Sequence, residues 1–413
     1  MAALAATGAF AQSSVSIAGN VDVGFGSKAT YGGDAKLFAK TNGVNDGFHA
    51  PNRIFIRVEE DLGGGLKASF VNEHGISPTN VQDWATRTGT GAPQFGAAKV
   101  ASATDAVINS DQSHWNSTNR GTYVALDGGF GQVRAGYLVS SLYNTSAQSG
   151  YFIGSENYGA LLKDFAIGDA GGARANGVQW TSPQLGMFKL HAQKQYGAER
   201  TFTSDASTIA GTTPTATQAY TLNKAERTAF RVDATVDALK ATYVRTDYKN
   251  AVGYAALATT PGTGVFGVAG TITTANTLAV DTSVKHDHLS AIYTMGPVAA
   301  TWQYNKASVD KVASSTLTAT SGDREMKSNQ YGIQYTAGAA QLFAITGSGT
   351  SKSPTATVND IKNTQYGVRY NMSKRTMAYF YSGVSKDSVP LAAGTVDRIS
   401  KGTFNGVGLT HAF

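Results

Sequence analysis

The side chains with the clearest chemical potential are arginines placed in segments where apolar and polar residues alternate. In "RIFIRVE", Arg53 and Arg57 share one face of the segment, and three aliphatic residues share the other. A guanidinium group stays charged even when neighbours crowd it, so such a set attracts or orients charged solutes without making a bond. The basic candidates of this kind are Arg53, Arg57, Arg120, Arg134 and Arg174.

Carboxylates that could oppose these arginines gather in one long connection. The stretch 141–173, between the segments "QVRAGY" and "NGVQWT", holds Glu156, Asp164 and Asp169, with Lys163 among them. Each arginine has a plainer alternative role, which is to pair with a neighbouring carboxylate and hold a loop in place; Arg57 could pair with Glu59 or Glu73 in this way. Further charged residues on the polar faces of alternating segments are Lys189, Arg231, Asp233 and Arg369.

Other groupings favour neither a metal, a cofactor nor a catalytic site. His286 and His288 flank Asp287 without an evident third ligand, so we interpret them as a strand-end pair. "GSGTSKS" lacks the Gly-Lys-Ser/Thr order of a phosphate loop, and "EEDLGGG" is typical of a capped turn. No G-x-S-x-G motif occurs, and the seven histidines do not suggest a triad.

Composition limits the class of protein. The 413 residues include no cysteine, 47 glycines and 15% charged residues, and the net charge of +6 is spread along the chain, unlike that of a nucleic-acid binder. No run approaches the apolar length of a membrane helix.

"AFA" before Gln12 matches a secretory cleavage site. We therefore expect residues 1–11 to be the remnant of a signal peptide and 12–413 a single exported domain.

Strand alternation recurs along the whole chain in one plan: strand, tight turn, strand, long polar loop. About seven such hairpins plus a first and a last strand predict an all-β fold, a transmembrane antiparallel barrel of about 16 strands with short periplasmic turns and long extracellular loops. Because every backbone group in lipid needs a partner, the first and last strands must pair. We expect Val407, Leu409 and Phe413 of the last strand to face lipid.

The segments "PNRIFIRVEEDLGGGLKASF", "RGTYVALDGGFGQVRAGY", "RANGVQWTSPQLGMF" and "VGLTHAF" resemble the neisserial-type general porins of beta-proteobacteria. The resemblance covers nearly all of residues 12–413. It implies a homotrimer in the outer membrane of a Gram-negative bacterium, in contact with its lipid and lipopolysaccharide. It also implies that loop 141–173 folds inward and that the barrel-assembly machinery recognises Phe413. The sequence departs from the family at Tyr137, Gln179 and Thr410, where arginine is frequent.

The expected function is passive diffusion of small hydrophilic solutes and ions, with no enzymatic activity. The inward loop and the basic wall would form a constriction, and the excess of arginine predicts a mild anion preference. One alternative is a substrate-specific porin with an aromatic track of Tyr143, Tyr151, Phe152 and Tyr158; another is a barrel hydrolase. The roles of the long loops near 76–115 and 250–285 stay open.

Overall fold

The structure is a computed structural model of the chain. It describes residues 13–31, 37–46, 49–76, 78, 119–145, 174–196, 200–204, 218–222, 226–249, 282–311, 324–353, 356–389 and 398–413. Within these ranges, no helix combines the length and the apolar character needed to cross a bilayer.

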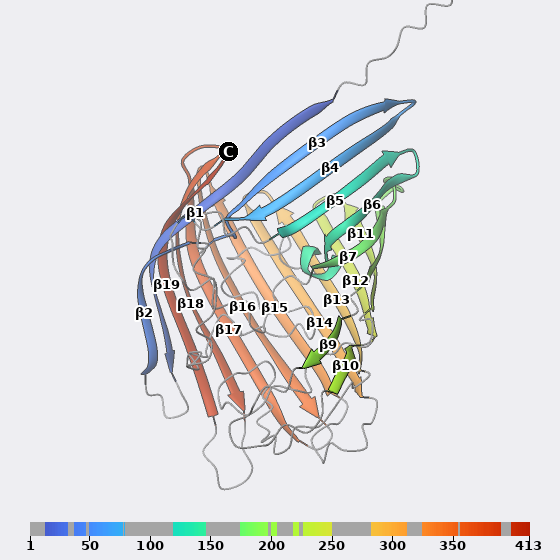
Figure 1. The fold of residues 1–413 in the computed structure, drawn as a ribbon. Helices are drawn as coiled ribbons and strands as arrows, with labels where there is room; N and C mark the ends of the chain where they lie inside the picture. Colours follow the sequence, from blue (N-terminus) through green and yellow to red (C-terminus); the bar gives the residue numbers. More distant parts are fainter. Residues whose placement is uncertain are drawn as a thin grey trace, which may run out of the picture.

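Alternating segments form antiparallel strands, as the sequence predicts (Figure 1). The first eight are β1 Ser14–Tyr31, β2 Leu37–Asp46, β3 Arg53–Gly63, β4 Leu66–Gly75, β5 Asn119–Gly128, β6 Gly131–Val139, β7 Arg174–Thr181 and β8 Phe188–Tyr196. A short helical turn, α1 Ser141–Tyr143, follows β6, and β9 Arg200–Ser204 and β10 Gln218–Leu222 form a separate two-stranded sheet.

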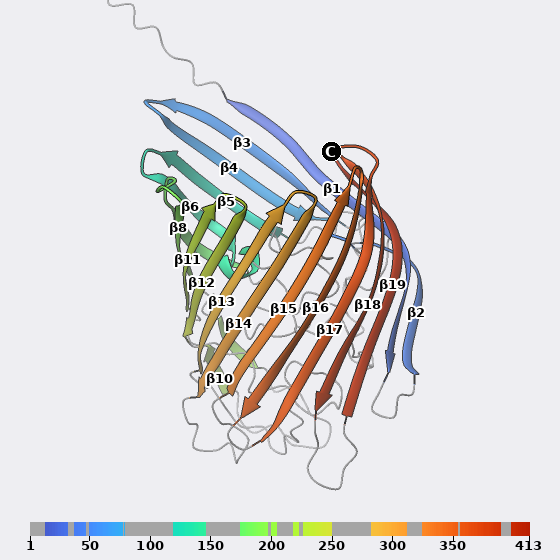
Figure 2. The same ribbon diagram turned by 180° about the vertical axis from the view of Figure 1, so that it is seen from behind.

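The remaining nine strands are longer on average and complete the wall (Figure 2). They are β11 Glu226–Val236, β12 Leu239–Lys249, β13 Thr282–Met295, β14 Val298–Lys311, β15 Arg324–Ala337, β16 Ala340–Ser353, β17 Ala356–Asn371, β18 Thr376–Val389 and β19 Arg398–Ala412.

The sheet closes on itself between its first and last strands. β1 pairs with β19 over twelve residue positions, with Val23 opposite Leu409. On its other edge β1 pairs with β3 through Ser14–Asn20 and with β2 through Val23–Tyr31. β2 and β3 therefore together occupy one strand position of the barrel, and we call each such position a stave. The seventeen strands of the sheet therefore make a barrel of sixteen staves. This confirms the predicted fold and the predicted closure.

Short turns and longer connections alternate along the chain. Gly296 and Gly338 lie in two-residue turns and adopt φ values of 55° and 59°, a region that glycine enters without a Cβ clash. These turns lie at the end of the barrel where the chain terminates (Figures 1 and 2). At the other end much longer connections join, for example, β4 to β5 and β12 to β13.

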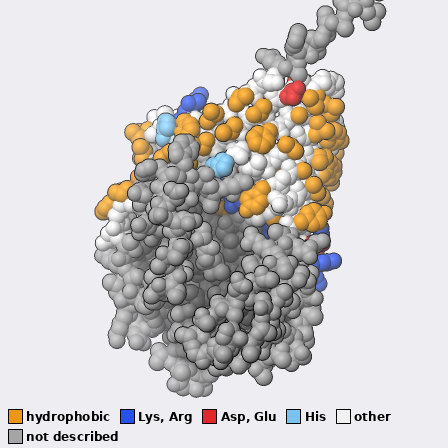
Figure 3. All heavy atoms as spheres, in the orientation of Figure 1, with side chains coloured by type: hydrophobic (Ala, Val, Ile, Leu, Met, Phe, Trp, Pro, Cys, Tyr) orange, Lys and Arg blue, Asp and Glu red, His pale blue; other side chains and the backbone are white. Residues whose placement is uncertain are grey.

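The two faces of β17 are inverted relative to those of a strand in a soluble protein. In β17, Gln365 and Arg369 are buried, whereas Tyr366 and Tyr370 on the opposite face are each more than half exposed. In Figure 3, apolar side chains are spread widely over the described part of the face that is shown. Apolar residues exposed on a closed sheet suit a hydrocarbon environment.

The terminal strand has the expected faces. Val407, Leu409 and Phe413 are exposed on the outside, and the opposite face places Phe404 inside with almost no exposure. Phe413 N donates to Gly19 O and Gly19 N donates to Phe413 O, both at 3.0 Å. The last residue is thus paired with β1 by its backbone.

Candidate pore constriction

Three arginines and one carboxylate gather on the inner face of the short strands. Glu73 Oε1 of β4 accepts from Arg120 Nε of β5 at 2.9 Å and lies 3.4 Å from Arg53 Nη1 of β3. Arg174, at the start of β7, interacts electrostatically with Arg120 and Glu73. We call Arg53, Arg120, Arg174 and Glu73 the arginine cluster. It carries three positive charges against one negative charge.

Strand geometry explains how residues from four strands meet here. Arg53 lies on the face opposite the outward Ile56, and Glu73 shares that inner face because it pairs with Phe55 in the β3–β4 ladder. The β4–β5 ladder shifts register between Glu73 and His74, and the shift accompanies the turn of Arg120 toward Glu73. Arg53 Nε also donates to Asn20 Oδ1 of β1 at 3.1 Å, which fixes its side chain.

Arg57 lies apart from the arginine cluster. Its Nη1 is 3.6 Å from Glu59 Oε1, and both side chains are about half exposed, at 53% and 51%. Arg57 has the same strand parity as Arg53 but lies closer to the β3–β4 turn. The structure therefore brings together Arg53, Arg120 and Arg174 of the predicted basic wall, and it places Arg57 in the plainer pair with Glu59.

Arg134 belongs to a neighbouring network of amides. Its Nη2 donates to Gln179 Oε1 at 2.5 Å, and its guanidinium lies 5.2 Å from the ring centroid of Tyr123. Gln193 Nε2 donates to the same Gln179 oxygen at 3.2 Å and to Val139 O at 2.8 Å. Gln179, where the resembling family often has arginine, thus serves here as the acceptor for Arg134.

This network also holds the first turn of the loop after β6. Gln193 Oε1 accepts from Ser141 N at 2.9 Å and from Ser141 Oγ at 3.1 Å. Ser140 Oγ accepts from Tyr143 N, and Leu142, fully buried, packs against Val244 of β12. The segment that follows β6 therefore enters the barrel interior.

The rest of the predicted inward loop lies outside the described residues. This applies to Glu156, Asp164 and Asp169, and to the aromatic residues Tyr151, Phe152 and Tyr158. Of the predicted aromatic track, Tyr143 is described: it is buried, and the Arg174 guanidinium lies 5.9 Å from its ring centroid.

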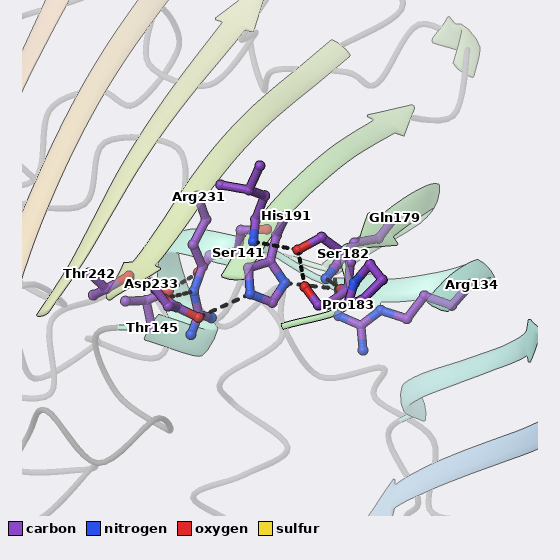
Figure 4. Close-up of polar contacts among 12 residues, drawn as sticks. Arg134, Ser141, Thr145, Gln179, Ser182, Pro183, His191, Arg231, Asp233 and Thr242 are labelled. Carbon is purple, nitrogen blue, oxygen red and sulfur yellow. Dashed lines mark hydrogen bonds and ion pairs between the residues drawn. The ribbon is translucent and has the colours of Figure 1, made fainter. Parts of the chain in front are cut away.

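A second charged group lies on β8, β11 and β12 (Figure 4). Asp233 Oδ1 accepts from Arg231 Nε at 2.7 Å and from Thr242 Oγ1 at 2.6 Å. Its other oxygen, Oδ2, is 3.0 Å from His191 Nε2, and His191 Nδ1 is 3.0 Å from Thr181 Oγ1. The predicted opposition of Arg231 and Asp233 is thus a direct ion pair. Lys189 is exposed near the turn end of β8.

Thr181, His191 and Asp233 form a hydroxyl–imidazole–carboxylate line that the sequence did not suggest. Their alignment superficially resembles a hydrolytic triad. However, Gln179 Nε2 also donates to Thr181 Oγ1 at 3.3 Å, and Asp233 is occupied by two further donors. We interpret the line as support that fixes Arg231.

Arg369 lies on β17 against aromatic rings. Its Nε donates to Tyr381 Oη at 3.0 Å, and its guanidinium lies 4.7 Å from the ring centroid of Phe343. His49 Nδ1 is 2.6 Å from the same Tyr381 hydroxyl. His49 belongs to residues 49–52 between β2 and β3, which we call the β2–β3 link. The link lies on the inner side of the wall.

The buried Asp22 contributes to holding the β2–β3 link in that position. Asp22 Oδ2 accepts from His49 N at 2.5 Å and from Ala50 N at 2.9 Å, and the Asp22 side chain is fully buried. Asn52 Oδ1 accepts from Asp22 N, which adds a reciprocal contact. Sequence reasoning missed Asp22, although a lone carboxylate in "SIAGNVDVGFG" was an available signal.

His286 and His288 are buried side by side on β13. His286 Nε2 and His288 Nδ1 lie 3.3 and 2.7 Å from the same Asn305 oxygen. In the part of the chain that the structure describes, no group of three or more His, Cys, Asp or Glu residues is arranged to hold a metal ion.

Comparison with solved structures shows the same architecture. The anion-selective porin from Comamonas acidovorans is 19% identical, with a TM-score of 0.64, and the match covers 97% of this chain and 100% of that chain. The trimer form of OmpT, an outer membrane protein of Vibrio cholerae, is 13% identical, with a TM-score of 0.60 and coverage of 97% and 99%. Salmonella typhi OmpF is 12% identical, with a TM-score of 0.51 and coverage of 97% of each chain.

At these identities the likeness establishes the fold, while the family follows from the sequence itself. A comparison with curated proteins found no match. A family model described as Gram-negative porin matches residues 1–388, which is most of the chain. With a closed sixteen-stave barrel, an apolar exterior and a charged interior, this chain belongs to the Gram-negative porin family.

Proposed function

We propose that this outer-membrane diffusion porin prefers anions and that the arginine cluster sets the preference. The observation that supports it is the excess of guanidinium groups: Arg53, Arg120 and Arg174 surround one carboxylate, Glu73. An ion that passes such a group meets a positive field across the channel. The Comamonas porin of the same fold is anion-selective, which agrees with this assignment.

The proposal also assigns each arginine of the basic wall a position along the channel. Arg53, Arg120, Arg134 and Arg174 would line the narrow zone, with Arg57 nearer the periplasmic turn and weaker in effect. Glu156, Asp164 and Asp169 of the loop 141–173 would face them. Lys189, Arg231 and Arg369, with Asp233, would extend the charged surface along the channel.

The channel is passive in this proposal, so no bond is made or broken and no cofactor is needed. A substrate-specific porin would instead show saturable block by one solute, with Tyr143 as part of an aromatic track. We favour general diffusion because Tyr143 is buried beneath Arg174 and does not offer an open face.

The assembly of the protein also belongs to this proposal. We infer a homotrimer of neisserial type, as the sequence resemblance implies. The exposed Phe413 at the end of β19 would be the residue recognised by the barrel-assembly machinery. Residues 1–11 would be removed as a signal peptide before insertion, and the outer surface would contact lipid and lipopolysaccharide.

The decisive experiment is the reversal potential of the purified protein in planar bilayers under a salt gradient. We expect a potential of the sign for anions. Arg120→Gln and Arg53→Gln should each move it toward zero, and Arg57→Gln should move it less. An unchanged potential in both cluster variants would remove the arginine cluster from the filter.

A further inference from the structure

The β2–β3 link leaves the sheet because its stave holds more residues than the neighbouring strand can pair. The pairing of β1 with β3 ends at Asn20, and the pairing of β1 with β2 begins at Val23. Two residues of β1 therefore stand opposite the six residues 47–52, which cannot all remain in the ladder. Asp22, which binds the link, belongs to the inner face of β1, so the link extends into the channel.

Aromatic rings on the inner wall brace the link in this position. The His49 ring lies 5.9 Å from the centroid of Tyr379 and 5.8 Å from that of Tyr381, and the two tyrosine rings are stacked on each other at 4.6 Å. Pro51 O accepts a hydrogen bond from Asn20 Nδ2 at 3.0 Å. The link thus reaches from β1 across β19 to β18, and its contacts fix it against the wall.

The helical turn α1 occupies the opposite wall of the barrel. Its Leu142 packs against Val244 of β12, and α1 also contacts β11. Counted from β1 as the first stave, β12 is the ninth, so eight staves separate the two strands. Staves eight positions apart face each other across a closed ring of sixteen, and β12 and β19 lie on opposite sides of the barrel in Figures 1 and 2.

The two inward segments also lie at the same height. Val244, which contacts α1, is five residues from Leu239 at the turn end of β12, and Tyr381, which contacts the link, is five residues from Thr376 at the turn end of β18. Five residues span about 16 Å along a strand, and the strands of a barrel share one tilt. Arg53 of the arginine cluster directly follows the link in the sequence, so the cluster lies beside this narrowing.

We propose that the β2–β3 link is a second element of the pore constriction, which faces the segment that begins at α1 and limits the size of the anions that pass. This rests on the proposed diffusion function. His49 and Ala50 are partly exposed, whereas Pro51 and Asn52 are buried, so the first two residues face the channel. The four residues contain no carboxylate or guanidinium group; the link therefore restricts size, and the arginine cluster sets the sign of the preferred ion.

The first test adds bulk to the link. Ala50→Trp should lower the single-channel conductance in planar bilayers roughly twofold, because an indole ring occupies part of the narrowest cross-section. It should also lower the size of the largest polyethylene glycol that enters the channel. The matched control is Thr235→Trp, since Thr235 is an exposed residue on the inner face of β11, next to the turn at the wide mouth. The control should change neither quantity appreciably.

The second test uses folded, conducting channels, so it does not depend on how well a tryptophan is accommodated. The chain contains no cysteine, and Ala50→Cys therefore introduces a single thiol. Thiol-specific methanethiosulfonate reagents, one cationic and one anionic, are added to open channels. Both should lower the conductance by adding bulk. The anionic group should also move the reversal potential toward zero, and the cationic group should move it away from zero.

The matched control for the reagents is Thr235→Cys, which should respond to neither of them. No change of current at Ala50→Cys, or an equal change at Thr235→Cys, would overturn the proposal, as would an unaltered polymer size limit in Ala50→Trp. An unaltered protein without anion preference would count against the proposed selectivity of the channel and not against the link, because bulk at Ala50 would still reduce the conductance.

Discussion

Tyr379 donates a 2.6 Å hydrogen bond to the buried carboxylate of Asp22, although 357 residues separate the two in the sequence. The contact joins β18 to β1 inside the barrel, across the intervening β19. The same carboxylate accepts two backbone N–H groups of the β2–β3 link. One side chain therefore ties β18, β1 and the β2–β3 link together, in addition to the backbone pairing of β1 with β19.

Asp22→Ala is expected to release the β2–β3 link and to destabilise the barrel. Three donors would lose a charged acceptor in a buried place, so the free energy of unfolding should fall by about 3 kcal/mol or more. Urea unfolding in detergent, followed by tryptophan fluorescence, measures the loss. Tyr379→Phe removes one donor and should cost about 1.5–3 kcal/mol. Equal stability of Asp22→Ala and the unaltered protein would show that the link is held by other contacts.

The sign of the field at the arginine cluster leads to the second prediction. Glu73→Gln removes the negative charge that Arg53 and Arg120 share, so the anion-to-cation permeability ratio should rise. A charge about 8 Å from a passing ion in water changes its energy by about 0.5 kcal/mol, which is about a twofold change in the ratio. Arg120→Gln should lower the ratio by a similar factor.

Reversal potentials under a potassium chloride gradient measure both variants. Arg57→Gln is the matched control, since Arg57 lies on the same strand as Arg53 but pairs with the exposed Glu59. A fall in the ratio for Glu73→Gln would mean that the cluster does not act as a net positive group.

The sequence could predict the features that depend on neighbouring residues, such as the two faces of a strand, but not contacts between distant residues. The alternation of Gln365, Tyr366 and Arg369 fixed the two faces of β17, because strand parity is a property of neighbouring residues. Parity could not separate Arg53 from Arg57, since both share one face and only their depth in the wall differs. Glu73 and Arg120 meet across 47 residues through a register shift, and that shift has no local signal.

The interruption of the second stave also escaped sequence reasoning. β2 and β3 both pair with β1, but β2 has little alternation to indicate a strand. Pro51 gave a partial signal, because proline lacks the N–H that a ladder needs. Asp22 is one of the residues that hold the link on the inner side, and a carboxylate bound to backbone groups nearly thirty residues away is not visible in a sequence pattern.

We expect the amide side chain of Gln193 to limit fluctuations of the single-channel current. It accepts from Ser141 N and Oγ and donates to Val139 O, so it fastens the start of the turn that follows β6. Gln193→Ala leaves these groups without their partner and should increase current fluctuations, with a stability loss of about 1–3 kcal/mol. Single-channel recordings give the noise, and Gln184→Ala in the exposed turn 182–187 is the control. Identical noise in both variants would contradict a fastening role.

Glycines on the inner face of the last strands make room for the rings that line the wall. A Cβ at Gly408 would clash with Tyr379 Oη and Cζ and lie 2.8 Å from Val23 O, and one at Gly383 would clash with the ring of Phe404. Gly408→Ala should therefore displace Tyr379 from Asp22 and lower the free energy of unfolding by about 1–3 kcal/mol.

The matched control for this substitution is Gly129→Ala, because Gly129 lies in the turn after β5 with open space around its Cβ position. Combining Gly408→Ala with Tyr379→Phe separates the two causes. If the alanine acts by pushing the hydroxyl away from Asp22, the double variant should lose less than the sum of the single losses, as coupled neighbours do. Additive losses in urea unfolding would show that the alanine acts through the Tyr379 ring or the backbone of β1 at Val23, and not through the Tyr379–Asp22 bond.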